Sequence, residues 1–143
     1  STRATKLLET QAIEADIQPL RVKSPGPGAG IFLLSRYEHG PAGFSALGKK
    51  GKPSERVAED AVNQLLAHHQ KQQPVDPFLA DQLMLPLLLA DGPTIYRTSQ
   101  VTGHQHTNAD LINLFYPDSV RIHGLDDGSG EITVNPIEIA AIT

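Results

Sequence analysis

The sequence predicts an α+β fold in which helices pack on a β-sheet. Segments with apolar residues at helical spacing alternate with short strand-like segments, and glycine or proline marks most of their boundaries. From residue 76 onward the expected order is helix, strand, helix, strand, strand, which is typical of helices layered on a sheet. A chain of 143 residues has the length of about one domain, so we expect one compact unit or two partial ones.

The composition excludes several classes of protein. The chain has 12 Lys and Arg against 16 Asp and Glu, a net charge of −4, so a general basic surface for polyanions is excluded. It has no cysteine, which excludes disulfides, thiolate zinc sites and cysteine nucleophiles and agrees with a cytoplasmic location. The longest apolar run is interrupted by Pro86 and is too short to cross a bilayer, so we expect no membrane association.

The N-terminal half is expected to contain two helices and a hairpin, separated by loops. Glycine and proline make a loop of residues 24–30, and residues 48–52 form the one basic run, on a turn. Residues 70–74 are polar and contain a proline, which is typical of a linker. The expected elements are a helix at 2–16, strands at 17–23, 31–37 and 44–47, and a helix from Ser54 to His69.

The C-terminal half is expected to pack two helices on a sheet. Asp76 is a favourable N-cap and Pro77 a favourable first residue for an apolar helix, in which Pro86 should cause a kink. Thr107 or Asn108 can cap the last helix. The expected elements are a helix at 78–90, a strand at 94–101, a helix that stops by residue 116, and strands at 120–123 and 131–134.

Two loops are candidates for anion binding. The glycines of residues 24–30 allow close approach of a phosphate to the backbone. This loop lacks the Lys-Ser/Thr ending of a P-loop and precedes a strand instead of a helix, so we interpret it as structural. The basic turn at residues 48–52 leaves two alternatives open, contact with a polyanion or simple solvation.

Asp81 and Gln82 are polar residues inside an otherwise apolar helix. An unpartnered carboxylate costs several kcal/mol to bury, so these side chains need partners. Phe78 lies one helical turn earlier, where its ring could contact the same ligand, for example a nucleobase. The alternatives are that Asp81 and Gln82 lie on an exposed stripe, bond to a neighbouring loop, or face a ligand.

His104 lies where a strand ends, a glycine turns the chain and a helix begins. The positive end of the helix dipole disfavours a charged imidazole, which leaves a neutral nitrogen as base, ligand or nucleophile. Backbone N–H groups at the same place favour a phosphate. The alternative is that His104 or His106 bonds a carbonyl group and packs. A zinc site is not predicted, since these histidines lack a third ligand.

Four motifs, taken in this order, resemble the C-terminal part of RNA 3′-terminal phosphate cyclases. The resemblance implies that residues 1–72 are the latter part of a smaller inserted α+β domain and that residues 73–143 are the final repeat unit of the main domain. A piece of a longer chain also agrees with Ser1 in place of an initiator methionine. The motifs are SPGPGAG at 24–30, SALGKKG at 45–51, LADQL at 79–83 and HQHTN at 104–108.

The resemblance implies an ATP-dependent enzyme that converts the 3′-terminal phosphate of RNA into a 2′,3′-cyclic phosphodiester. His104 would attack the α-phosphorus of ATP to form a covalent histidine–AMP, assisted by a divalent cation, Mg²⁺ or Mn²⁺. Phe78 and Gln82 would contact the nucleobase, and Asp81 would lie beside the phosphate or the metal. Phe78 stands where the resemblance implies a hydroxyl-bearing aromatic residue, so stacking is retained there and a hydrogen bond is not. The implied partners are ATP and RNA 3′-phosphate ends.

Two alternatives of other classes stay open. A ribosome-assembly relative of the same fold keeps the scaffold but lacks the nucleophilic histidine, and the intact His-x-x-Thr-Asn motif argues against it. Self-association into a homo-oligomer is expected if the sheet exposes an edge and an apolar face. The resemblance also implies that further ATP and metal contacts come from an N-terminal portion, so we expect this chain by itself to be inactive or very weak.

Overall fold

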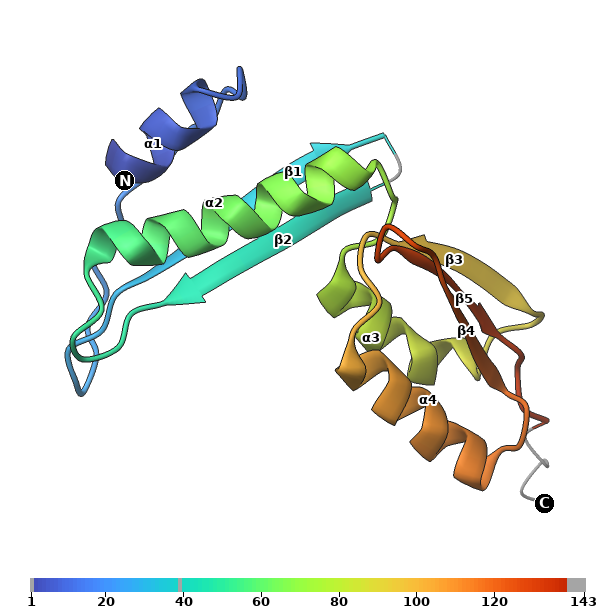
Figure 1. The fold of residues 1–143 in the computed structure, drawn as a ribbon. Helices are drawn as coiled ribbons and strands as arrows, with labels where there is room; N and C mark the ends of the chain where they lie inside the picture. The colour runs from blue at the N-terminus through green and yellow to red at the C-terminus, as the bar shows by residue number, and fades with distance from the viewer. Residues whose placement is uncertain (1, 39, 139–143) are drawn as a thin grey trace. The chain divides into compact units, whose positions relative to one another are not determined.

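The computed structural model describes residues 2–38 and 40–138 (Figure 1). The chain divides into a first unit, residues 1–36 and 41–67, and a second unit, residues 37–40 and 68–143. Its elements are α1 (Thr2–Glu9), β1 (Gly30–Tyr37), β2 (Gly40–Leu47), α2 (Ser54–Lys71), α3 (Pro77–Leu87), β3 (Thr94–Thr98), α4 (Gly103–Phe115), β4 (Val120–Gly124) and β5 (Gly130–Val134). None of the helices in the described part of the chain combines the length and the apolarity needed to span a membrane.

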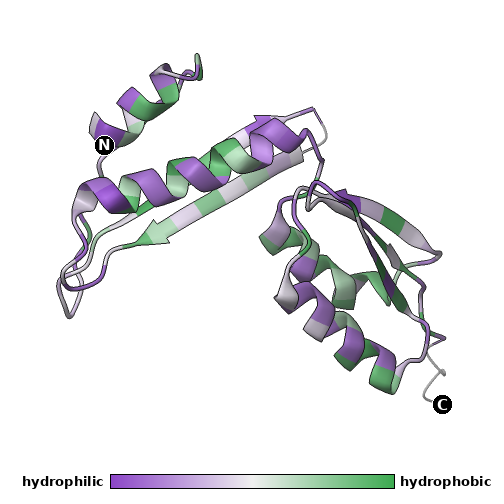
Figure 2. Cartoon of the chain, in the orientation of Figure 1, coloured by the Kyte–Doolittle hydropathy of each residue, from purple (hydrophilic) through white to green (hydrophobic). Residues whose placement is uncertain are grey.

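In the first unit, α2 lies along one face of the β1–β2 hairpin (Figure 1). Figure 2 shows hydrophilic and hydrophobic bands alternating along α2, as the apolar spacing of its sequence predicts. Successive strand residues point to opposite faces, so every second residue of β2 is buried on the helix side. The buried side chains of these elements are Leu33, Ala42, Phe44, Ala46, Val57, Ala58, Ala61, Val62 and Leu65.

The helix expected at residues 2–16 is too long, because α1 ends at Glu9. The chain reverses immediately after α1: the backbone N–H of Ile13 donates to the carbonyl of Leu8 at 3.0 Å. Ala12 adopts the left-handed conformation, with φ of 56°, that commonly closes a helix. The apolar residues that suggested a longer helix therefore belong partly to this turn.

The strand expected at residues 17–23 is also wrong, since no strand is found there. Pro19 in its middle has no N–H to donate to a ladder. The hairpin strands expected at 31–37 and 44–47 are confirmed, and both are longer at one end than the sequence indicated.

The second unit is a three-stranded antiparallel sheet with β5 between β3 and β4. Because β3 and β4 are both antiparallel to β5, they run parallel to each other, and α4 makes the crossover between them. Helices α3 and α4 lie on the same side of this sheet (Figure 1). The predicted α+β class, with helices packed on a sheet, is confirmed.

The core of the second unit fills the space between its two helices and the sheet. Met84 of α3 and Ile132 of the central strand are fully buried at its middle. The hydroxyl of Tyr96 donates to the carbonyl of Ala80 at 2.7 Å and ties β3 to α3. Burial raises the pKa of this phenol, so it stays protonated and remains a donor. The other buried members are Val75, Leu88, Ala109, Ile112, Val120 and Val134.

The caps of the two helices in the second unit differ in how well the sequence predicted them. Asp76 caps α3 as expected, but the helix ends at Leu87 instead of residue 90, with Pro86 in its last turn. The cap of α4 was predicted wrongly: it is Thr102, not Thr107 or Asn108. The last helix therefore begins five or six residues earlier than expected. The strand expected at 94–101 ends at residue 98, and the strands expected at 120–123 and 131–134 are confirmed.

His68 makes the stability of the second unit sensitive to pH. It is 3% exposed at the end of α2, and its Nδ1 lies 2.8 Å from Oγ of Ser99. Burial lowers the pKa of His68 below its ordinary value of 6.5. As the pH falls, the unfolded chain therefore takes up this proton first, so the free energy of unfolding is highest above about pH 6.5 and declines below it. Thermal unfolding followed by circular dichroism between pH 8 and pH 5 measures this decline.

A non-titrating neighbour provides the control. Gln70 is exposed and carries no titratable group, so Gln70→Ala should leave the pH dependence of unfolding unchanged. His68→Gln should flatten it, because the buried titrating group is gone. An equal slope in the two variants would contradict this assignment.

Candidate functional site

The first turns of α3 and α4 are joined by side-chain hydrogen bonds. The amide of Gln105 donates to the carbonyl of Pro77 at 2.9 Å, and that of Asn108 donates to the carboxylate of Asp81 at 2.7 Å. The two bonds connect residues at nearly equal offsets along the helices, so α3 and α4 run in the same direction (Figure 1). The positive ends of both helix dipoles therefore lie at the same end of the pair.

Gln105 is the site residue that sequence reasoning missed. It is fully buried, and each polar atom of its side chain has a partner. Its Oε1 accepts from the backbone N–H of Thr102 at 3.1 Å, and its Nε2 also donates to the carbonyl of Gln100 at 3.2 Å. The hydroxyl oxygen of Thr102 accepts in turn from the Gln105 backbone N–H at 3.3 Å. The signal was present in the sequence, because Thr-x-x-Gln is the pattern of a capping box.

His104 is the second residue of α4, so it lies inside the first helical turn and not before the helix as the sequence suggested. Its side chain is exposed and makes no hydrogen bond or ion pair with any residue of the described chain. The His104 ring therefore does not bond a carbonyl group within the described residues. The imidazole is accessible beside the positive ends of two helix dipoles.

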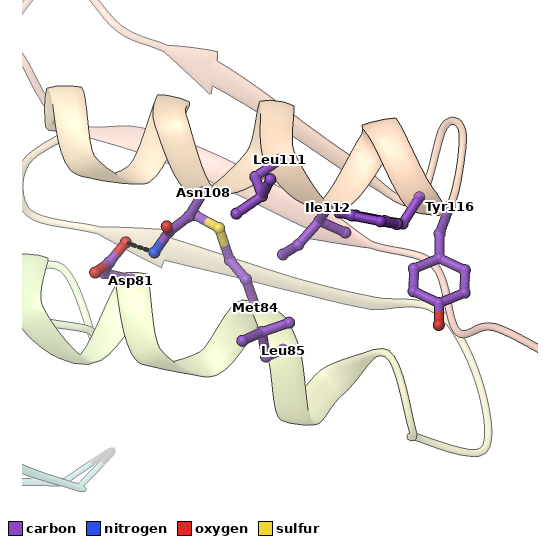
Figure 3. Close-up of a pocket in the computed structure, with 8 residues that line it drawn as sticks. Asp81, Met84, Leu85, Asn108, Leu111, Ile112 and Tyr116 are labelled. Atoms are coloured by element: carbon purple, nitrogen blue, oxygen red, sulfur yellow. Dashed lines mark hydrogen bonds between the residues drawn. The ribbon is translucent and has the colours of Figure 1, made fainter.

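The carboxylate of Asp81 is held by Asn108, which lies one turn after His104 on the same helix (Figure 3). Asp81 is half-buried, so this bond supplies the partner that the sequence analysis required. The partner comes from a helix and not from a neighbouring loop. Asn108 thus joins the second turn of α4 to the second turn of α3.

A groove of about 230 Å³ runs between α3 and α4 from this bond toward their C-terminal ends. Figure 3 shows Asp81 and Asn108 at one end of it and Tyr116 at the other. Its polar end lies near the middle of the two helices, and most of the remaining walls are apolar. The lining residues are Asp81, Met84, Leu85, Asn108, Leu111, Ile112, Phe115 and Tyr116.

Phe78 and Gln82 both lie on α3 and are one helical turn apart, so their side chains are on the same face. Phe78 is 54% exposed and Gln82 is also exposed, which leaves an aromatic surface and an amide open to a ligand. The structure therefore places all four candidate residues, Phe78, Asp81, Gln82 and His104, on adjoining turns of the helix pair. Their roles in binding and catalysis stay predictions.

The other sequence candidates do not form a site of this kind. Within residues 2–38 and 40–138, no three side chains of the metal-binding types gather closely enough to hold an ion. The carbonyl of Ala29, in the glycine-proline loop, accepts from the backbone N–H of Gly48 at 2.7 Å. This bond ties the loop to the basic turn, in agreement with a structural role for the loop.

Comparisons with known proteins point to one family. Residues 1–70 match the family model described as the RNA 3′-terminal phosphate cyclase insert domain. The chain is 50% identical over 113 residues to the RNA 3′-terminal phosphate cyclase of Gloeothece citriformis, covering 79% of this chain and 32% of the relative. The resemblance to RNA 3′-terminal phosphate cyclases is confirmed.

Similar proteins of the same name come from other bacteria and from archaea. The cyclase of Methylococcus capsulatus is 38% identical over 135 residues, 94% of this chain and 37% of the relative. The cyclase of Archaeoglobus fulgidus is 38% identical over 124 residues, 87% of this chain and 37% of the relative. The chain thus spans about a third of the length of the curated cyclases that it matches, and these matches extend beyond the insert domain.

Replacement of Gln105 tests whether this side chain holds the site together. Gln105→Ala removes the fully buried amide that bonds Pro77, Gln100 and Thr102, so the backbone N–H of Thr102 loses its acceptor and the tie between α3 and α4 is lost. We expect the free energy of unfolding to fall by about 2–4 kcal/mol. Chemical unfolding in urea measures this loss. His106→Ala, at the exposed neighbouring position, should change the free energy of unfolding by less than about 0.5 kcal/mol; equal effects would contradict the role given to Gln105.

Proposed function

We propose that this chain takes part in the ATP-dependent conversion of an RNA 3′-terminal phosphate to a 2′,3′-cyclic phosphodiester, with His104 as the nucleophile. The observation that carries the proposal is the exposed imidazole in the first turn of α4, next to the first turn of α3. The relatives are named for this chemistry and support it. A cytoplasmic location agrees with an RNA substrate and with the absence of cysteine.

The reaction proceeds in three transfers. A ring nitrogen of His104 attacks the α-phosphorus of ATP, the bond from that phosphorus to the bridging oxygen breaks, and pyrophosphate leaves. An oxygen of the RNA 3′-phosphate then attacks the adenylyl phosphorus, and the phosphorus–nitrogen bond to His104 breaks. Finally the vicinal 2′-hydroxyl loses its proton and attacks the activated 3′-phosphorus, which closes the cyclic diester and releases AMP.

The helix ends supply electrostatic stabilisation for the first transfer. The neutral imidazole of His104 is the nucleophilic form. As negative charge develops on the phosphate oxygens, the dipoles of α3 and α4 both stabilise it. The buried amide of Gln105 keeps these helix ends together without occupying the exposed surface where the phosphate binds.

Residues of α3 bind the adenosine part of the nucleotide. The exposed ring of Phe78 stacks on the base, and Gln82, one turn later on the same face, contacts its polar edge. Asp81 accepts a hydrogen bond from Asn108 and is therefore fixed in orientation beside the phosphate. These assignments give each polar residue of this apolar helix a function.

The divalent cation, Mg²⁺ or Mn²⁺, is not held by this chain alone. The described residues offer no cluster of three metal-binding side chains, so we assign no step to the ion and place its remaining ligands outside this chain. We likewise propose that further contacts to ATP lie in the part of the relatives that this chain does not match. The chain by itself is then inactive or very weak.

Transfer of label from ATP tests the nucleophile. The aligned segment of the Gloeothece citriformis cyclase is replaced by this chain, and the hybrid is incubated with ATP labelled at the α-phosphate. We expect covalent label on the hybrid and its complete loss in His104→Ala. His106→Ala, an exposed histidine two residues away, should retain the label.

The outcome also separates the enzyme from a scaffold. A non-catalytic ribosome-assembly scaffold would take up no label in any form of the hybrid. Label that persists in His104→Ala would move the nucleophile elsewhere. Peptide mapping of the labelled hybrid by mass spectrometry identifies the modified residue directly.

A further inference from the structure

The two units of the chain carry opposite net charges. Residues 1–36 and 41–67 contain nine Lys and Arg against six Asp and Glu, whereas residues 37–40 and 68–143 contain three against ten. The overall charge of −4 therefore conceals a basic first unit. Apart from the helix ends of the second unit, the part of this chain that attracts a polyanion is therefore the first unit.

Most cations of the first unit are not neutralised by neighbours. Arg3 and Arg56 both pair with Glu59, and Lys52 pairs with Asp60. Among the described residues the remaining cations of this unit make no ion pair, so they can contact anions in solution. They are Lys6, Arg21, Lys23, Arg36, Lys49 and Lys50.

The face of the β1–β2 hairpin that points away from α2 carries exposed apolar side chains. Alternation along β1 places Phe32, Leu34 and Arg36 on this face, and their neighbours on the strand are less exposed. Phe32 is 66% exposed, Leu34 is 51% exposed and Leu47 of β2 is 76% exposed. We call this set, with Arg36, the outer face of the hairpin.

Phe32 is supported by the backbone of the partner strand. A Cβ added to Gly43 would lie 3.1 Å from Cε2 and Cζ of the Phe32 ring, so the ring rests over this glycine. An aromatic ring over a glycine also stabilises a hairpin, which explains the position of Phe32 but does not require its high exposure. A ring held on one side by a sheet and open on the other provides a surface on which nucleobases stack.

Cations lie at both ends of the outer face. Arg36 is near the end of β1, and Lys49 and Lys50 follow the end of β2, which lies at the opposite end of the antiparallel hairpin (Figure 1). A strand of eight residues is about 25 Å long, so several nucleotides can extend between these charges. Phosphates would meet the cations while bases lie over the aromatic and apolar middle.

We propose that the outer face of the hairpin, with Lys49 and Lys50, binds single-stranded RNA. Bases stack on Phe32, and phosphates contact Arg36 and the two lysines. The inference rests on the proposed function, because that function supplies RNA as the polyanion, and it adds a binding surface for the part of the substrate that does not react. Bases in a duplex are already stacked and paired, so this surface favours an unpaired strand.

Fluorescence anisotropy with the 143-residue chain tests the surface. The probe is a labelled single-stranded RNA of about ten nucleotides. Phe32→Ala should weaken its affinity by about fivefold or more, while Phe32→Tyr, which keeps the ring, should bind within about twofold of the unchanged chain. Ile95→Ala is the matched control, since this apolar strand residue is 62% exposed in the acidic second unit and does not line the groove between α3 and α4, so its loss should leave RNA affinity unchanged.

The lysines are tested by salt. Replacing Lys49 and Lys50 together by Gln should reduce the slope of log affinity against log salt concentration by about 1.4, or about 0.7 for each phosphate that these lysines neutralise. A duplex of the same sequence should bind more weakly than the single strand. Circular dichroism of each variant shows whether its fold is kept.

Several outcomes overturn the proposal. They are failure of the chain to bind the probe at low salt, equal losses in Phe32→Ala and Ile95→Ala, or a duplex bound as tightly as the single strand. Sedimentation equilibrium measures whether the chain self-associates. If Phe32→Ala dissociates a dimer and leaves RNA affinity unchanged, the outer face of the hairpin binds a second copy of the chain instead of RNA.

The two proposals can fail separately. In the hybrid cyclase, Phe32→Ala should keep covalent labelling by ATP, because ATP does not use the hairpin. Labelling without Phe32-dependent RNA binding overturns the RNA surface alone. Phe32-dependent RNA binding without labelling overturns the proposed nucleophile alone and leaves the RNA surface supported.

Discussion

The organisation of the second unit depends on polar bonds between the first turns of two parallel helices. Placing the positive ends of two helix dipoles side by side is unfavourable, and it is tolerated here because acceptors surround those ends. Asp76 accepts two backbone N–H groups of α3 at 2.9 Å, and Gln105 closes the cap of α4 while it donates to the carbonyl of Pro77. The positive potential that remains at the surface is the property that an anionic ligand can use.

The same bonds explain why an apolar helix contains a carboxylate. Asp81 is half-buried, and burying its carboxylate without a hydrogen-bond donor would cost free energy. Asn108 of α4 supplies that donor. At the other end of α4, the side chain of Asn113 bonds both the N–H and the carbonyl of Val120, which fixes the start of β4. Amide side chains thus set the position of α4 against both of its neighbours.

Sequence reasoning succeeded where the signal is local. The cap at Asp76, the apolar spacing of α2 and the two short strands of the C-terminal hairpin each depend on residues close together in the chain. It failed at the end of α1, where a left-handed Ala12 reverses the chain, and at the cap of α4, where Thr102 competes with two later candidates. Helix ends depend on small differences between similar caps, so their positions are weakly determined by sequence.

The candidate site shows the same division. Residue types and local spacing identified Phe78, Asp81 and Gln82 on one helix, and His104 at the start of another, as candidates. They did not identify Asn108 as the partner of Asp81, because these residues are 27 positions apart and meet only when two helices pack. The charge difference between the units was equally hidden, since a single net charge averages over both.

The strand order of the second unit has a consequence for synthesis on the ribosome. β5 is the last strand of the described chain, yet it lies in the centre of the sheet and pairs with both others. Until β5 has left the exit tunnel, β3 and β4 have no strand between them. The apolar sides of α3 and α4 then have no complete sheet to pack against. The sheet of the emerging polypeptide therefore cannot form until β5 arrives, and the apolar surfaces that it buries stay uncovered until then.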